Sequence, residues 1–246
     1  MNDIDIFKNI IMETNNIVFF GGAGVSTESN IPDFRSENGL YKTKNNYSFP
    51  PDIMLSHSFF QDHTEDFYDF YKNKLIYKDA KPNKAHYALA KLEKMGKLKA
   101  VVTQNIDGLH QTAGSKNVLE LHGSVHNNYC LKCGKTFNLD YVINSESIIP
   151  YCDNCKNIVR PDVVLYEEYL DDGIVEAAGK YISNADVLIV GGTSLVVFPA
   201  ANMINQFRGK KLILINKTAT PADSSADLVF HCSIGDIMSK VINNLS

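Results

Sequence analysis

Short runs of uncharged residues recur along the chain, and they constrain its fold more than any other feature of the sequence. They are rich in β-branched and aromatic side chains and do not alternate polar with apolar positions; they occupy 17–20, 100–103, 187–190, 212–215 and 228–230. A strand that is apolar on both faces belongs in a parallel sheet that helices cover on both sides. We therefore expect an α/β fold built on a Rossmann-like parallel sheet with helices on both faces.

Helical periodicity fills the segments between these runs, since the apolar residues of 4–14 and of 85–95 each share one helical face. Two stretches do not fit the alternation, and we interpret both as insertions that form a smaller domain. Residues 37–78 are rich in Tyr, Phe, Asn and Lys and include a predicted helix at 64–75, whereas residues 124–159 hold four of the five cysteines.

Those four cysteines form two pairs of the same spacing. Cys130 and Cys133 make the first pair, and Cys152 and Cys155 make the second, with eighteen residues between the pairs. Two such pairs can bring four thiolates to the corners of a tetrahedron, which is the geometry of structural Zn²⁺ sites. Four sulfur ligands leave no open position for a reacting water, so we expect one structural Zn²⁺ per chain. The fifth cysteine, Cys232, lies in a β-rich run, and we expect it in the core.

The charges nearly balance, with 24 Lys and Arg against 28 Asp and Glu and a formal net charge of −4. Such a chain has no general electrostatic attraction to nucleic acid or to an anionic membrane. Asp3 and Asp5 precede any apolar run, which is the wrong order for a secretory signal, and Gly191 and Pro199 interrupt the longest uncharged window, 187–207. We expect a cytoplasmic protein with no membrane partner and no specific nucleic-acid partner.

A glycine turn, Gly22-Ala23-Gly24, follows the first predicted strand. Thr27 stands where a complete dinucleotide fingerprint has its third glycine, so this motif alone leaves a nucleotide site and an ordinary tight turn equally open. Polar or glycine-rich residues also follow three later strands; they are 103–107, 191–194 and 216–217. Because ligands bind at the carboxyl ends of parallel strands, this pattern favours a dinucleotide.

His122 lies at the predicted junction with the cysteine module, where clefts form, and is a candidate catalytic residue.

Taken together, the motifs of this chain resemble those of the sirtuin family. They are Gly22-Ala23-Gly24-Val25-Ser26, Ile31-Pro32-Asp33-Phe34-Arg35, residues 103–110, Leu121-His122-Gly123, the four cysteines, residues 160–164 and Gly192-Thr193-Ser194-Leu195. The resemblance covers nearly the whole chain in the family's own order and is to the compact bacterial members. The sequence departs from the family pattern at Asn30 and Glu167, which are commonly glycine, and at Phe198, which is often tyrosine.

The resemblance implies an NAD-dependent protein-lysine deacetylase, which converts acetyl-lysine and NAD to lysine, nicotinamide and O-acetyl-ADP-ribose. It implies catalytic roles for three residues: His122 as the general base on a ribose hydroxyl, Asn105 as the residue that orients the nicotinamide ribose, and Asp107, with Ile106, as the carboxamide site. The other residues that it assigns to the dinucleotide are Ala23, Thr27, Phe34, Arg35, Gln104, Thr193, Ser194, Asn216 and Ile234; His122 and Asp107 also contact the cofactor.

The same resemblance suggests three parts of the chain. The Rossmann-like NAD-binding domain would comprise 1–36, 79–123 and 160–246; a cofactor loop and helical insertion would span 37–78, and a zinc-binding module 124–159. Sirtuins that prefer succinyl-lysine or malonyl-lysine carry a Tyr-x-x-Arg pair in the helix of this insertion. The counterpart here is Tyr68-x-x-Tyr71, which implies a preference for acetyl-lysine unless Lys72 or Lys74 supplies the missing charge.

Two other functions compete with this interpretation. The parallel sheet and the glycine turn alone also suit an NAD-dependent oxidoreductase, and the cysteine module alone suits a non-catalytic zinc-ribbon binding module. The module contains just three basic residues, Lys132, Lys135 and Lys156, which argues against nucleic acid as its partner. Neither alternative accounts for residues 104–107 together with His122.

Overall fold

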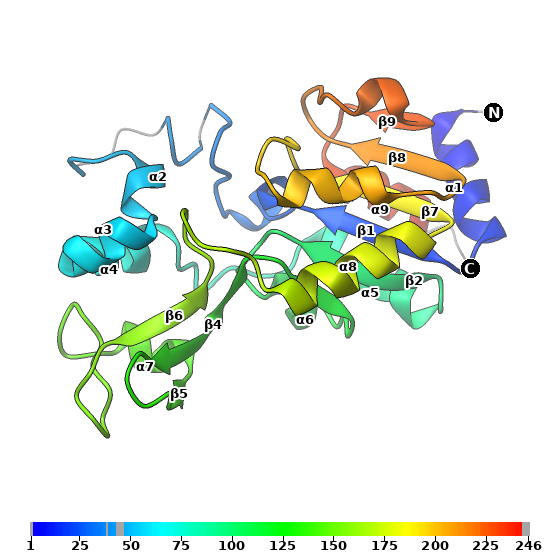
Figure 1. Cartoon of the computed structure of the whole chain (residues 1–246). Helices are drawn as coiled ribbons and strands as arrows, with labels where there is room; N and C mark the ends of the chain where they lie inside the picture. The colour runs from blue at the N-terminus through cyan, green and yellow to red at the C-terminus, as the bar shows by residue number, and fades with distance from the viewer. Residues whose placement is uncertain (1, 38, 43–46, 243–246) are drawn as a thin grey trace.

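The computed structural model describes residues 2–37, 39–42 and 47–242. Within these residues, six parallel strands form the main sheet in the order β3-β2-β1-β7-β8-β9 (Figure 1). The strands are β1 (Ile17–Gly21), β2 (Leu98–Thr103), β3 (Val118–Glu120), β7 (Val187–Gly191), β8 (Lys211–Ile215) and β9 (Leu228–Phe230). Counted along the chain, this is the strand order 3-2-1-4-5-6 of a Rossmann fold, so the predicted fold class is confirmed.

Each strand sends alternate side chains into two separate cores. In β1, Ile17 and Phe19 pack against one set of helices, whereas Val18 and Phe20 pack against the other. The first set consists of α1 (Asp3–Glu13), α5 (Lys84–Lys94) and α9 (Ile234–Ile242); the second consists of α8 (Asp172–Asn184) and the 3₁₀ helix η3 (Ala200–Gln206). Because both faces are covered, uniformly apolar runs are the stable choice for these strands.

Register places the ends of the central strands at one level. β1 pairs with β7 from Ile17 opposite Val187 to Gly21 opposite Gly191, and Gly21 also lies opposite Thr103 of β2. The loops that follow β1, β2 and β7 therefore begin side by side at the carboxyl edge of the sheet.

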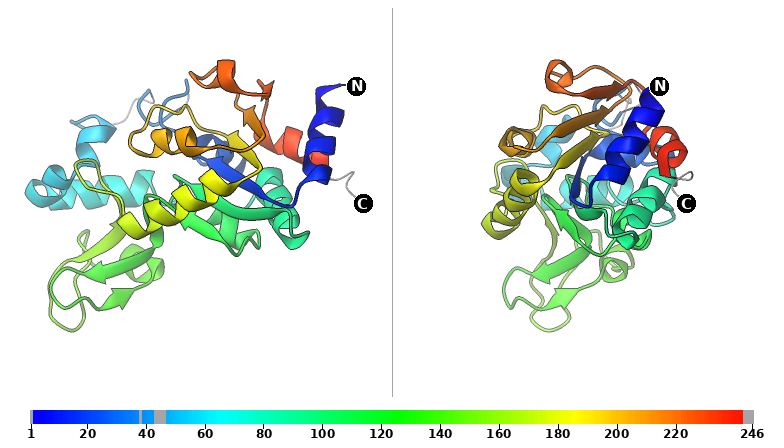
Figure 2. Two further views of the ribbon diagram at one scale, coloured as in Figure 1. Left: turned by 45° about the vertical axis from the view of Figure 1, so that its right-hand side comes forward. Right: turned by 90° about the vertical axis from the view of Figure 1, so that its right-hand side faces the viewer.

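A buried lysine joins α1 to this sheet. The last turn of α1 contains no basic residue of its own. Lys97, which is 7% exposed, instead donates from Nζ to the carbonyl oxygens of Ile11, Met12 and Thr14 at distances of 2.9, 3.1 and 3.1 Å. A cation at a helix C-terminus satisfies carbonyls that the helix itself leaves free. The other neighbour of this helix is α9, which packs beside it (Figure 2).

The two predicted insertions pack together into a small lobe beside the main sheet (Figure 1). It consists of α2 (Pro51–Met54), α3 (His57–Asp62), α4 (Thr64–Lys74), α7 (Leu139–Ile143) and a three-stranded antiparallel sheet of β4 (Gly123–Cys130), β5 (Thr136–Phe137) and β6 (Val159–Val163). Aromatic residues of α4 share one core with Cys130, Cys152 and Val159. The helical insertion and the cysteine module therefore stabilise each other.

The remaining regular segments are short. They are the 3₁₀ helices η1 (Ala23–Val25), η2 (Thr27–Ser29) and η4 (Asp223–Ser225) and the helix α6 (Leu109–Thr112). Among the described residues, no helix combines the length and the apolar character that a membrane crossing requires.

Two histidines are buried between α5 and α6. His86 is 0% exposed and His110 1%, and their ring centroids lie 4.7 Å apart. Neither ring nitrogen of His110 has a hydrogen-bond partner within the described part of the chain. Burial lowers the pKa of His86 to about 4 and that of His110 to about 3. Both imidazoles are consequently neutral in the folded protein at pH 7.

We expect these histidines to make the fold sensitive to acid. Below the ordinary histidine pKa of about 6.5, the unfolded chain binds protons that the folded chain does not, so stability falls as the pH drops from about 6.5 toward 4. By this linkage each histidine lowers the free energy of unfolding at pH 5 by on the order of 2 kcal/mol, compared with neutral pH. Urea unfolding at pH 7.5 and at pH 5 measures the effect. The loss of stability from pH 7.5 to pH 5 should be smaller in His110→Phe than in the wild type. An equal loss in both proteins would contradict this account.

Candidate functional site

The loops after β1 and β7 are in direct contact at the switch point of the sheet, where the strand order reverses. The amide of Gly24 donates to the carbonyl of Gly192 over 2.7 Å. A Cβ at Gly24 would lie 2.8 Å from the Gly192 backbone, and Gly192 itself adopts a φ of +62°. Glycine is required for this approach, which leaves backbone accessible where Rossmann folds bind pyrophosphate.

Three of the predicted cofactor residues, which follow β2, β7 and β8, form one hydrogen-bonded chain. Gln104 donates from Nε2 to Thr193 Oγ1 over 3.1 Å, and the Thr193 amide donates to Asn216 Oδ1 over 2.9 Å. Asn216 is 7% exposed, and its Nδ2 has no hydrogen-bond partner among the described residues. An unpaired buried amide donor is costly, so this position suits a ligand that supplies an acceptor, as the ribose and phosphate oxygens of NAD do.

Four further predicted cofactor residues also lie near this edge. Ala23 is in η1, and Thr27, the first residue of η2, donates from Oγ1 to Gly24 O over 3.0 Å. Ser194 follows Thr193 directly. Ile234 begins α9, and its side chain lies against Gly191 at the end of β7. The structure therefore brings together residues from 23 to 234 at the carboxyl edge.

Asn105 and Asp107 are joined through a serine. Asn105 Nδ2 donates to Ser26 Oγ over 3.0 Å, and Ser26 Oγ donates to Asp107 Oδ2 over 2.6 Å. The Leu109 amide donates to the other carboxylate oxygen of Asp107 over 2.9 Å. Asn105 and Ser26 are buried, so two polar side chains and a carboxylate are held rigidly beside the glycine turn. Ile106, between them, is partly buried against the core of the small lobe.

His122 follows β3 and is bonded to the segment that contains these residues. Its Nδ1 lies 2.9 Å from the carbonyl oxygen of Gln104. Because a carbonyl can only accept, the hydrogen is on Nδ1 and the lone pair of Nε2 is available as a base. Burial lowers the pKa of His122 from its ordinary value, while the hydrogen bond to Gln104 acts in the opposite direction. The ring is therefore neutral at pH 7.

Phe34 and Arg35 lie on the cofactor loop, which comprises the described residues of 33–42. The carboxylate of Asp33 accepts from the amides of Arg35 and Ser36 at 3.0 and 2.7 Å and so shapes the start of the loop. Phe34 is partly buried against the core of the small lobe, whereas Arg35 is exposed. No hydrogen bond described in the structure joins either side chain to His122, Asn105 or Asp107.

Sequence reasoning did not select two residues that contact the Asp107 segment. Ser26 was visible as part of the glycine turn, but its bridging position depends on a contact between residues 81 apart in the chain. His126 is exposed, and its Nε2 lies 3.1 Å from the carbonyl oxygen of Asp107. No spacing in the sequence signals that contact.

Two departures from the sirtuin pattern occupy glycine-like backbone conformations. Asn30 has a φ of +63° and Glu167 a φ of +74°. Asparagine tolerates this region, but glutamate is strained there. The Glu167 carboxylate accepts from the amide and the hydroxyl of Ser58 at 2.9 and 3.0 Å, at the start of α3. These two hydrogen bonds offset the strain and fix the segment to the small lobe.

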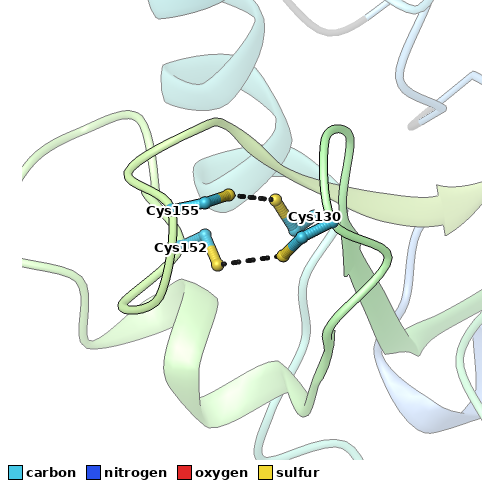
Figure 3. A group of neighbouring side chains, drawn as sticks. Cys130, Cys152 and Cys155 are labelled. Carbon is cyan, nitrogen blue, oxygen red and sulfur yellow. Dashed lines mark hydrogen bonds between the residues drawn. The ribbon is translucent and has the colours of Figure 1, made fainter.

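The four paired cysteines meet at one point, as the spacing predicts. Their Sγ atoms all lie within 4.8 Å of one another; Cys130 and Cys155 are 3.3 Å apart, and Cys133 and Cys152 are 3.7 Å apart (Figure 3). A disulfide would need about 2.05 Å, whereas four Zn–S bonds of about 2.3 Å place the sulfurs roughly 3.8 Å apart. The four thiolates and their spacing therefore fit a Zn²⁺ ion with no coordination position left open.

Both cysteine turns have the same backbone form. Gly134 follows the first pair with a φ of +69°, and Lys156 follows the second with a φ of +60°. In each turn the amide of this residue donates to the carbonyl of the first cysteine, Cys130 or Cys152.

Cys232, by contrast, is exposed. The expectation that it lies in the core is wrong, because it follows β9 in a surface turn before α9.

Comparison with known proteins agrees with the motifs. The model of the Sir2 family matches residues 22–199. An NAD-dependent protein deacetylase of Clostridium acetobutylicum is 68% identical over 242 residues, which are 98% of this chain and 99% of the relative. A solved structure of Sir2 with a deacetylated p53 peptide and 3'-O-acetyl-ADP-ribose is 39% identical and covers 99% of both chains with a TM-score of 0.90; one of Sir2 with p53 peptide and NAD⁺ is 38% identical and covers 98% of both with a TM-score of 0.86. The chain belongs to the Sir2 family, the sirtuins.

Proposed function

We propose that this sirtuin removes the acetyl group from lysine side chains of proteins in an NAD-dependent reaction, with nicotinamide and O-acetyl-ADP-ribose as the other products. The observation that carries the proposal is the position of His122. Its Nδ1 is held by the backbone of Gln104, the residue before Asn105, and its Nε2 is left as a neutral base. The relatives named as NAD-dependent protein deacetylases support the same activity.

The residues of the site divide the work between binding and chemistry. NAD, when bound, would supply the ribose that accepts the acetyl group. It would also be the source of the released nicotinamide. Asp107 and Ile106 hold the carboxamide of the nicotinamide, and Asn105 orients the attached ribose. His122 accepts the proton of a ribose hydroxyl at Nε2. The reaction needs no nucleophilic side chain, because the attacking groups belong to the two substrates and to the one water molecule that the overall reaction consumes. The protein mainly positions these reactants and keeps other water from the ribose.

The remaining predicted residues bind the rest of the dinucleotide. Ala23 and Thr27 lie at the glycine turn after β1, where backbone amides suit phosphate oxygens. Gln104, Thr193 and Asn216 offer amide and hydroxyl groups to ribose oxygens. Ser194 and Ile234 complete this side of the site. Phe34 and Arg35 approach from the cofactor loop.

Three other expectations stay predictions. The protein works in the cytoplasm on acetylated proteins, with no membrane partner and no specific nucleic-acid partner. The chain divides into a Rossmann-like NAD-binding domain of residues 1–36, 79–123 and 160–246, a cofactor loop and helical insertion of residues 37–78, and a zinc-binding module of residues 124–159.

The activity is tested by incubating the zinc-loaded protein with NAD and an acetyl-lysine peptide. Release of nicotinamide should require both the peptide and its acetyl group, and the absorbance of NADH should not appear. Growth of NADH absorbance would instead favour the oxidoreductase alternative. Intact NAD and intact peptide would favour a binding module.

Removal of the base should slow the chemical step. We expect His122→Ala to lower turnover by about 10²- to 10⁴-fold, the usual cost of losing a general base, while the Kd for NAD changes little. The half-exposed His63 offers a matched control, and His63→Ala should retain wild-type turnover. Because the pKa of His122 is lowered, the acid limb of the wild-type pH profile should fall below about 6.5. Near-normal turnover of His122→Ala would refute the role.

The zinc site has a structural role in this proposal. Four sulfur ligands close the coordination sphere, and the cysteines share a core with α4, so metal binding contributes to the folding free energy of the small lobe. A Zn²⁺ ion in such a closed site would stabilise the small lobe and would take no part in the reaction.

We expect Cys130→Ala to lose the metal and at least about 2 kcal/mol of stability, or roughly 4–8 °C in Tm. Metal analysis should find about one zinc per wild-type chain. Cys232→Ala removes the exposed cysteine and should leave both zinc content and Tm unchanged. If Cys130→Ala keeps its zinc and its Tm, the structural role is wrong.

The acyl group is the remaining question of specificity. Tyr68 and Tyr71 are fully buried on α4, and burial raises the pKa of both phenols, so both stay neutral. Tyr68 OH donates to Val159 O over 2.5 Å, and Tyr71 OH has no hydrogen-bond partner among the described residues. Lys72 Nζ donates to Ser145 Oγ over 2.7 Å and is held on the cysteine module. Of the two lysines in the last turn of α4, Lys72 is therefore engaged by the cysteine module, whereas no hydrogen bond or ion pair of Lys74 is among those described.

We therefore expect acetyl-lysine to be preferred over succinyl-lysine. A buried carboxylate without a cationic partner costs several kcal/mol, so kcat/KM on matched peptides should differ by at least about tenfold in favour of acetyl. Lys72→Ala should leave this ratio unchanged. Equal efficiency on the two peptides would contradict the prediction, and a loss of succinyl activity in Lys72→Ala would then identify the missing charge.

A further inference from the structure

The cofactor loop is folded back on itself by two backbone hydrogen bonds. The Leu40 amide donates to Asp33 O over 2.8 Å, and the Tyr41 amide donates to Phe34 O over 3.0 Å. This pairing places the Tyr41 ring beside the two predicted cofactor contacts of the loop. The ring centroids of Phe34 and Tyr41 are 5.9 Å apart, and the guanidinium carbon of Arg35 lies 5.6 Å from the Tyr41 centroid. Tyr41 is therefore in contact with both Phe34 and Arg35.

Tyr166 belongs to the segment 164–170, which follows β6 and is fixed on both sides. The first amide of this segment donates to the carbonyl of His122 over 2.9 Å. The Tyr166 amide donates to Leu55 O, and Tyr166 O accepts from the His57 amide, at 2.9 and 3.0 Å. The backbone of Tyr166 is thus tied to the small lobe on one side and, through its segment, to the proposed general base on the other.

A side-chain hydrogen bond connects these two segments. The hydroxyl oxygens of Tyr41 and Tyr166 lie 2.8 Å apart, and either can donate. Burial, followed by this hydrogen bond, raises the pKa of Tyr41, so its phenol stays neutral over the pH range of an enzyme assay. Both segments lie between the main sheet and the small lobe (Figure 1). The bond therefore joins the loop that carries Phe34 and Arg35 to the segment that is bonded to His122.

We propose that Tyr41 and Tyr166 are positioning residues that hold the cofactor loop in place for NAD; the proposal rests on the NAD-dependent function proposed above. A loop that is already ordered loses less conformational entropy when a ligand binds. Tyr166 provides a fixed anchor because its backbone is bonded independently of its hydroxyl. Tyr41 transmits that position to Phe34 and Arg35.

The two hydroxyls can be removed without disturbing the rings. Tyr41→Phe and Tyr166→Phe each delete one oxygen atom, and Tyr87→Phe makes the same change on an exposed residue of α5. Calorimetric titration of the zinc-loaded protein with NAD measures the effect. A neutral hydrogen bond corresponds to about 2- to 10-fold in affinity, so both loop variants should bind NAD more weakly by that factor. Tyr87→Phe should match the wild type.

The double variant distinguishes a shared bond from two separate effects. Because either change breaks the same bond, Tyr41→Phe with Tyr166→Phe should bind NAD within about twofold of each single variant. In steady state the KM for NAD should rise while kcat stays within about twofold. Tm should remain at the wild-type value. A role confined to stability would instead lower Tm and kcat together.

Unchanged NAD affinity in both single variants would overturn the proposal. So would tighter binding, or losses that add in the double variant. A wild-type protein that binds NAD but releases no nicotinamide from an acetylated peptide would contradict the proposed function instead. Even then, the NAD affinities of the wild type and the loop variants would test the role of the tyrosine pair, because these affinities are measured without turnover.

Discussion

The close contact between the loops that follow β1 and β7 is the constraint on which the site depends. Register brings Gly21 and Gly191 level, and the amide of Gly24 then bonds to the carbonyl of Gly192. A Cβ at Gly192 would lie 2.3 Å from the Val25 amide nitrogen, so no side chain can enter here. The switch point of the sheet is consequently lined by backbone. A dinucleotide can approach it as closely as its phosphates require.

Gln104 connects this backbone surface with the chemistry. Its side chain bonds to Thr193 after β7, and its carbonyl oxygen orients the imidazole of His122. The next residues along the chain are Asn105 and, two further on, Asp107, which Ser26 of the glycine turn bonds together. The proposed binding groups and the proposed base therefore belong to one hydrogen-bonded frame, which suits an enzyme that positions reactants without a nucleophile of its own. A displacement of the loop after β2 or of the loop after β7 would therefore move the proposed binding groups and the proposed base together.

The sequence predicted the sheet and the cysteine cluster well because both depend on local pattern. Uniform apolar runs mark strands that are buried on both faces, and the cysteine spacing is set by two short turns. The strand Val118–Glu120 was not predicted because it is short and half-buried. The contact of Ser26 with Asp107 and the exposure of Cys232 depend on tertiary packing, which no local pattern carries. The conformation of Glu167 likewise depends on Ser58, a distant residue.

We infer that this frame transfers an acetyl group from lysine to the ribose of NAD. Mass spectrometry of all products from NAD and one acetyl-lysine peptide tests it most directly. Equal amounts of free lysine peptide, nicotinamide and O-acetyl-ADP-ribose are expected. Free acetate with unmodified ADP-ribose as the primary products, or deacetylation that leaves NAD intact, would contradict it.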